Sequence, residues 1–159
     1  MVKTGPERST VVLSLLLALV VGALAYVLLR PGNDDTSARR DALEAATTAA
    51  IDLTTYDHDH LDRDFAWVDD RATASFAKEY AAANKPLRAI ITKLEAHAVG
   101  TVVEASATMQ DSSRAKVLLF VDQTITNGTD DKTRTERNRV VMSMVKRDGT
   151  WLVDDVELR

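Results

Sequence analysis

The chain has no cysteine among its 159 residues, and its basic side chains are fewer than its acidic ones. The first absence excludes a disulfide, a thiolate nucleophile and a zinc site built on cysteine. Lys and Arg number 20 against 24 Asp and Glu, which gives a net charge of −4. Residues 1–30 carry a net +2, so residues 31–159 carry −6. We expect no nucleic-acid partner, because an acidic domain does not attract a phosphate backbone through bulk charge.

Charge is also missing from one long segment, Thr10 to Leu29, whose sequence is TVVLSLLLALVVGALAYVLL. A helix of this length is roughly 30 Å long at about 1.5 Å per residue, which matches the hydrocarbon core of a bilayer. The roughly 125 residues that follow suffice for one small domain. We predict a cytoplasmic leader at 1–9, a transmembrane helix at 10–29, a linker at 30–36 and an extracytoplasmic domain at 37–159.

A cleaved signal peptide is the alternative to this anchor. Lys3 and Arg8 form a basic start, and Ala23-Leu24-Ala25 resembles a cleavage site. The apolar run continues past that site to Leu29, which favours an uncleaved anchor. Basic residues flank the run on both sides, so their count does not fix the orientation. We expect the N-terminus in the cytoplasm, because the globular part follows the span.

One side of the predicted span carries small residues. They recur at helical spacing and are Ser14, Ala18, Gly22 and Ala25. Small side chains let two membrane helices approach closely, so this side is a candidate packing face for a membrane partner. Small residues are also common in membrane helices that bind nothing.

Periodicity predicts three helices followed by four antiparallel strands. Apolar residues recur at helical spacing up to about residue 96, and beyond it they alternate with polar ones. Pro86 falls inside the third helix, where it would kink or split the helix. The expected helices are about 37–54, 60–70 and 73–96, and the expected strands are about 99–110, 114–126, 134–147 and 150–158. This α+β pattern predicts three helices packed on a curved four-stranded antiparallel sheet.

The centres of the expected strands are apolar on both faces. Val117, Leu119 and Val121 point to one face, whereas Leu118 and Phe120 point to the other. If helices cover only one face, the other meets a partner, a second copy, a lipid or a cavity made by the sheet's own curl. The alternative is that curvature and the last strand bury both faces inside the domain.

The segment Asp57–Asp64 (DHDHLDRD) gathers His58 and His60 among several carboxylates. Such side chains could ligate zinc or another divalent ion. However, residues at i and i+2 face the same side only in a strand, and this segment is expected to enter a helix with Asp59 or Asp62 as N-cap. We interpret it as a solvated helix entry and expect no metal site.

Four segments, taken in order after a single N-terminal span, resemble the actinobacterial Mce-associated membrane proteins. They are Ala45–Asp57 (AATTAAIDLTTYD), Leu61–Phe65 (LDRDF), Val121–Asn127 (VDQTITN) and Asp148–Val156 (DGTWLVDDV). The resemblance covers nearly the whole chain. It implies a cone-shaped extracytoplasmic domain similar to nuclear transport factor 2 and SnoaL.

That resemblance also implies an accessory role without established catalysis. Mce systems are multi-subunit envelope transporters that move lipids or sterols inward, and the associated proteins are thought to stabilise or assist them. The implied partners are other subunits of such a transporter, with a lipid and a second copy of the chain as further candidates. The implied location is the cell membrane. No cofactor and no catalytic residue carry over from the resemblance.

A membrane-tethered enzyme or ligand-binding domain is the competing hypothesis, because cone-shaped folds also host isomerases, dehydratases and hydrolases. Such chemistry needs an acid or base inside an apolar cavity. The candidate cavity acids are Asp122, on the same face of its strand as Phe120, and Asp154, between Leu152 and Val156. Each would otherwise lie at a strand end or pair with an arginine on the neighbouring strand. No full constellation with histidine accompanies them, so we do not expect an enzyme.

Overall fold

The computed structural model describes the backbone from Gly32 to Arg159 and the side chains from Thr36 onward. The predicted leader, the predicted span at 10–29 and its candidate packing face of Ser14, Ala18, Gly22 and Ala25 lie outside these residues. Among the helices that are described, none is long and apolar enough to cross a membrane.

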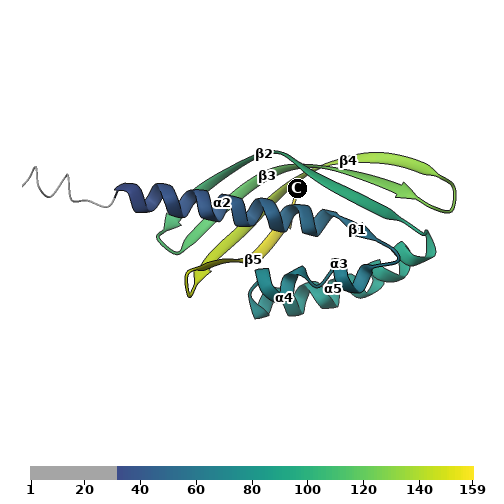
Figure 1. Cartoon of the computed structure of the whole chain (residues 1–159), viewed down its shortest axis with the longest axis horizontal. Coiled ribbons are helices and arrows are strands. Elements are labelled where there is room, and N and C mark those ends of the chain that lie inside the picture. The colour runs from purple at the N-terminus through teal and green to yellow at the C-terminus, as the bar shows by residue number, and fades with distance from the viewer. Residues whose placement is uncertain (1–31) are drawn as a thin grey trace, which may run out of the picture. The chain divides into compact units, whose positions relative to one another are not determined.

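Five antiparallel strands form one sheet in the order of the chain, and each strand is labelled in Figure 1. The strands are β1 (Tyr56–Asp57), β2 (His97–Asp111), β3 (Arg114–Asn127), β4 (Lys132–Arg147) and β5 (Thr150–Leu158). The expected α+β class and the four long strands are confirmed. The expected count of four is wrong, because β1 adds a strand that pairs with the start of β2. Two residues are too few to produce a period-two pattern in the sequence.

Four helices are present in the described part of the chain: α2 (Gly32–Thr54), α3 (Leu61–Asp64), α4 (Trp67–Arg71) and α5 (Ala74–Lys93). In Figure 1 the strands β2–β4 form the upper layer and α3–α5 lie below them. Helix α2 begins inside the predicted linker at 30–36, since no proline or glycine after residue 32 interrupts it. Pro86 does not split α5.

The helix predicted at 60–70 is instead the pair α3 and α4. Phe65 packs with Leu61 in a small apolar cluster, whereas Trp67 packs in the main core. Residues two positions apart lie on nearly opposite sides of one helix. The break after Asp64 therefore lets both aromatic rings be buried, which a continuous helix would not.

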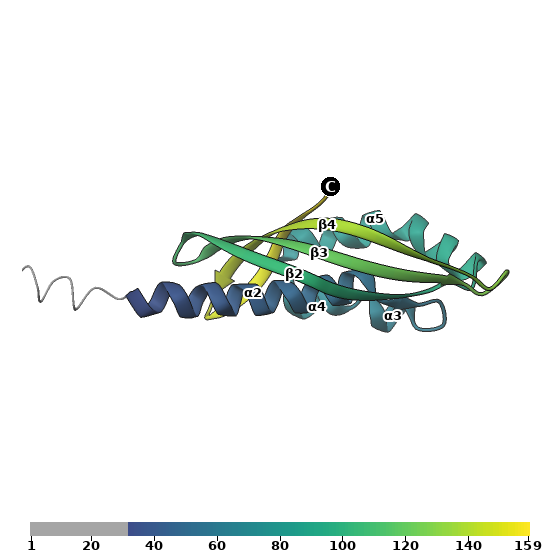
Figure 2. The same cartoon turned by 90° about the horizontal axis from the view of Figure 1, so that it is seen from above.

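The main core lies between α2 and the inner face of the sheet. Helix α2 contributes alanines that are at most 9% exposed, which lets its backbone come close to the strands. Viewed from above, β2, β3 and β4 run side by side (Figure 2). The buried partners on the sheet are Val117, Leu119, Val121, Val140, Met142, Met144, Trp151 and Val153. Burial of these side chains holds α2 against the sheet.

The end of α2 is fixed to β2 and β3 by close contacts. Gln123 Nε2 donates to the carbonyl of Thr54 at 2.9 Å, and the Gly100 N–H donates to Thr55 Oγ1 at 3.1 Å. A Cβ atom on Gly100 would lie only 1.8 Å from Thr54 Oγ1. Glycine is required there because the helix end occupies the space of a side chain.

Candidate functional site

The outer face of the sheet, opposite α2, carries exposed apolar side chains. Leu118 and Phe120 on β3 are 40% and 41% exposed, whereas Leu119 between them is fully buried. Val141 on β4 lies opposite Leu118 in the register. We call Leu118, Phe120 and Val141 the outer patch. The expectation that both faces of the strand centres are apolar is confirmed, and the outer face is not buried within the described residues.

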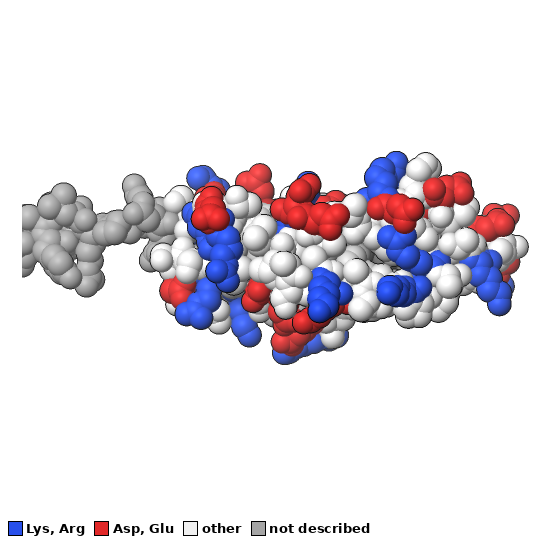
Figure 3. Space-filling view, turned by 90° about the horizontal axis from the view of Figure 1, so that it is seen from below, with Lys and Arg blue, Asp and Glu red and all other residues white. Residues whose placement is uncertain are grey.

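Polar and charged residues border the outer patch. Phe120 lies between Glu104 on β2 and Arg139 on β4, and Leu118 lies opposite Ser106 on β2. Apolar side chains surrounded by polar ones are typical of a protein-binding surface. The opposite side of the domain, seen from below in Figure 3, shows acidic and basic side chains scattered among uncharged ones. No area of a single charge sign dominates that view.

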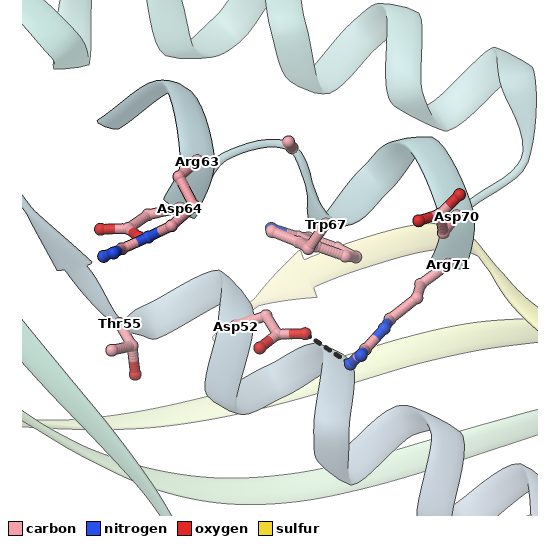
Figure 4. A pocket seen from close by; sticks show the side chains of 8 residues that line it. Asp52, Thr55, Arg63, Asp64, Trp67, Asp70 and Arg71 are labelled. Atoms are coloured by element: carbon pink, nitrogen blue, oxygen red, sulfur yellow. Dashed lines mark hydrogen bonds and ion pairs between the residues drawn. The ribbon is translucent and has the colours of Figure 1, made fainter. Parts of the chain in front are cut away.

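A polar hollow of about 380 Å³ lies between the end of α2 and the helices α3 and α4, as Figure 4 shows. Its charged groups are largely paired. Arg71 Nη1 lies 2.7 Å from Asp52 Oδ2, and Arg63 Nε lies 2.8 Å from Asp64 Oδ1. The second carboxylate oxygen of Asp64 accepts the Asp57 N–H at 2.9 Å. The pair of Arg71 and Asp52 links α4 to α2, so we interpret this hollow as a structural contact.

Trp67 forms one wall of the hollow and belongs to a group of packed aromatic rings. The group runs from Tyr56 through Phe65 and Tyr80 to Trp67 and Phe76, with centroids 5.3–6.3 Å apart. Trp67 Nε1 donates to Tyr80 Oη at 3.2 Å. Burial raises the pKa of Tyr80, and the hydrogen bond from Trp67 opposes this rise. This hydrogen bond and the ring contacts hold the Tyr80 side chain against Trp67.

The two candidate cavity acids lie apart. Asp122 is half-buried on β3 opposite Arg137, and Asp154 is exposed on β5 where the register with β4 shifts. Strand β4 separates them, and neither lines the polar hollow beside α2. The register places Arg137 at the cross-strand position that the alternative interpretation named for Asp122.

The segment Asp57–Asp64 leads into a helix, as expected, but its N-cap differs from the expected residues. Asp57 ends β1, a turn follows at residues 58–59, and α3 begins at Leu61. His60 occupies the N-cap position and makes no capping hydrogen bond through its side chain. The expected N-caps do not act as such, because Asp59 lies in the turn and Asp62 lies within α3.

Sequence reasoning missed the residues that join α2 to the sheet and to α4. Gly100 interrupts an otherwise β-branched stretch of β2, which is the kind of signal that marks a close backbone approach. Gln123 and the pair of Asp52 and Arg71 gave no such signal, because their partners are distant along the chain.

Solved structures share the fold at low sequence identity. An IcmL-like type IV secretion system protein from Legionella pneumophila superposes with a TM-score of 0.65 and 14% identity, over 76% of this chain and 91% of that one. The periplasmic domain of DotI gives a TM-score of 0.63 and 12% identity, over 74% and 91%. At such identities the likeness establishes the fold alone, an α+β domain with a curled antiparallel sheet.

Mycobacterium tuberculosis, strain ATCC 25618 / H37Rv, has relatives at higher identity. The uncharacterized protein Rv1362c is 30% identical over 148 residues, which are 90% of this chain and 67% of the relative. The outer membrane protein Rv1973 is 32% identical over 128 residues, which are 79% and 78% of the two chains. Residues 7–158 match the family described as uncharacterized protein Rv1363c/MT1408-like, and the chain belongs to that family.

Proposed function

We propose that the chain is a non-catalytic accessory subunit of a multi-protein complex in the cell envelope. In this proposal the predicted span at 10–29 anchors it to the cell membrane, and the outer patch binds a partner subunit. The observation that carries the proposal is the exposure of Leu118 and Phe120 at the centre of a strand whose opposite face is fully buried. Apolar side chains at such a position are typical of a surface that is covered in an assembly.

The relatives and fold neighbours support an envelope location. One relative is named an outer membrane protein, and the fold neighbours include a periplasmic domain and a type IV secretion system protein. These proteins share the fold or the family with this chain, and the proposal extends their setting to it. A single predicted span before the folded domain agrees with an anchored protein of the envelope.

The finer proposal is that the complex is an Mce-type importer of lipids or sterols. Its support is the ordered resemblance of four segments, from Ala45–Asp57 to Asp148–Val156, to the Mce-associated membrane proteins. The proposal that the subunit does no catalysis is supported by the described hollow, where Arg71 and Arg63 are already paired with carboxylates.

A ligand-binding cone is the weaker candidate because the space under the sheet is filled. Val117, Leu119 and Met142 are fully buried, and the alanines of α2 pack directly onto them. A small-molecule site is usually a hollow of about 300–1,000 Å³ lined mainly by apolar side chains. The hollow of about 380 Å³ beside α2 has the volume but is lined mostly by charged residues.

Affinity purification of the tagged full chain in mild detergent tests the proposal. We expect Phe120→Glu to lose most of the co-purifying envelope proteins. Leu87→Glu is the matched control, because Leu87 is 40% exposed but lies on α5. We expect this control, and Asp122→Ala and Asp154→Ala, to keep the complex. An unchanged complex with Phe120→Glu would contradict binding through the outer patch.

The identity of the co-purifying proteins and lipids tests the finer proposal separately. Transporter subunits of the Mce type would support it. Recovery of a different envelope complex through the outer patch would contradict the Mce assignment and keep the accessory role. A turnover activity abolished by Asp154→Ala would contradict the absence of catalysis.

A further inference from the structure

The three histidines of the chain gather around one carboxylate. His58 and His60 follow Asp57 along the chain, and the pairing of β1 with β2 places His97 opposite Asp57. His58 Nδ1 lies 3.5 Å from Asp57 Oδ1, and His60 Nδ1 lies 3.8 Å from Asp57 Oδ2. The sequence alone did not connect His97 to this segment, because β1 was not expected. The grouping therefore arises from the fold as well as from local sequence.

One ring nitrogen in this group has no hydrogen-bond partner. His58 Nδ1 is a buried atom and makes no hydrogen bond, although the ring as a whole is partly exposed. Buried polar atoms without a partner are rare in folded proteins, and coordination of an ion is one way in which such an atom is satisfied. On the other side of the ring, His58 Nε2 lies 3.3 Å from Asp59 Oδ1. Carboxylate oxygens therefore lie near both ring nitrogens.

The ligand atoms are already close together. One atom each from Asp57, His58 and Asp59 lies within 4.8 Å of the other two. Ligands about 2.1 Å from one ion are at most roughly 4.2 Å apart, so small side-chain rotations would complete the set.

The backbone holds this turn in place. The His58 N–H donates to the carbonyl of Ala96 at 3.2 Å, and the His60 N–H donates to the carbonyl of Asp57 at 2.9 Å. The Asp57 N–H donates to Asp64 Oδ2 at 2.9 Å. A ligand set on a fixed turn loses little conformational freedom when it binds an ion.

We propose that Asp57, His58 and Asp59 bind a divalent transition-metal ion of the zinc class, with His60 beside them as a further ligand. Imidazole combined with carboxylate suits zinc, whereas Mg²⁺ prefers oxygen ligands alone. Bound there, the ion joins the end of β1 to the turn that leads into α3. It thereby stabilises the region where β1 meets β2.

Titration of ZnCl2 into the metal-free full chain in mild detergent tests the site, with an affinity tag that contains no histidine. We expect one equivalent to bind by calorimetry and to raise the melting temperature, because an ion that binds only the folded state stabilises it. His58→Gln should weaken zinc binding by about tenfold or more and remove most of the thermal shift. MgCl2 at the same concentration should produce neither effect.

Asp59→Asn and its control Asp70→Asn keep the test decisive if His58→Gln folds poorly. Both aspartates are exposed, and Asp70 lies on α4 outside the group. We expect Asp59→Asn to weaken zinc binding and Asp70→Asn to leave it unchanged. Equal zinc affinity in the unaltered chain and Asp59→Asn would overturn the proposal. No stoichiometric binding of zinc, or binding of Mg²⁺ at the same concentration, would overturn it as well.

Discussion

Leu118 and Leu119 are neighbours in the middle of β3, yet the first is 40% exposed and the second is fully buried. The inner face, to which Leu119 belongs, is covered by the alanines of α2. The outer face presents the same kind of side chain to solvent. Apolar area stabilises the fold when it is removed from water, so the buried inner face contributes to stability and the exposed outer face contributes little. The outer face adds apolar surface that the isolated domain does not need, which agrees with its use in binding.

Alanine substitution at these two positions should give the largest difference in stability between the two faces. Leu119→Ala is expected to lower the free energy of unfolding by about 2–5 kcal/mol, because it leaves a cavity in a close-packed core. Leu118→Ala should lower it by less than about 1 kcal/mol, since its side chain is already in contact with water. Urea unfolding of the full chain in detergent, followed by circular dichroism, measures both. Equal losses would show that the outer face is buried in the full chain.

A smaller loss of stability is expected from a substitution at Gly100, where β2 meets the end of α2. Gly100→Ala places a methyl group against Thr54 Oγ1, which is held by its hydrogen bond to the carbonyl of Ala50 at 2.6 Å. We expect a loss of about 1–3 kcal/mol from this overpacking. Thr101→Ala, the next residue of β2 and exposed, should change stability by no more than about 0.5 kcal/mol.

A double-mutant cycle tests whether the contact with Thr54 causes this loss of stability. Thr54→Gly removes both side-chain atoms that the new methyl group would meet. The double variant should therefore be more stable than the sum of the two single losses predicts, since contacting residues are not additive. Simple additivity would mean that the backbone separates at this point and that the close approach of α2 is not required.

The period-two pattern of β3 was enough to predict which side chains share a face, because alternation is a local property of a strand. Local sequence signals also predicted the long strands and the Asp148-Gly149 turn. In that turn Asp148 and Gly149 both have positive φ. The pairing of β1 with β2 was not predictable in this way. It depends on His97 and Ala98, which are about 40 residues away along the chain.

The surroundings of the candidate residues were harder to predict than the strands. The sequence placed Asp122 correctly on the face of Phe120, but only the register shows that Arg137 lies opposite it. The sequence indicated correctly that Asp57 and His58 lead into a helix, which begins at Leu61. It did not indicate that β1 pairs with β2, which places His97 opposite Asp57.

The turn between β2 and β3 belongs to neither face, and its acid should have the smallest effect on stability. Asp111 accepts the Ser113 N–H at 2.8 Å and pairs with Arg114, and these contacts lower its pKa to about 2, the backbone hydrogen bond contributing most. Because the folded pKa is depressed, the contribution is present above the unfolded value near 3.8 and is lost as the pH falls through about 2.

Carbon-detected NMR titration of the Asp111 carboxyl group measures this directly, and Arg114→Ala should raise its pKa toward 3.8. The two contacts are exposed, so the accompanying loss of stability at acid pH should be slight. This loss at acid pH should be the same in Leu118→Ala as in the unaltered chain, since the effects of changes at distant, independent sites add. A larger loss of stability at acid pH in Leu118→Ala would show that the turn and the outer face are energetically coupled. The outer patch would then also contribute to the stability of the fold.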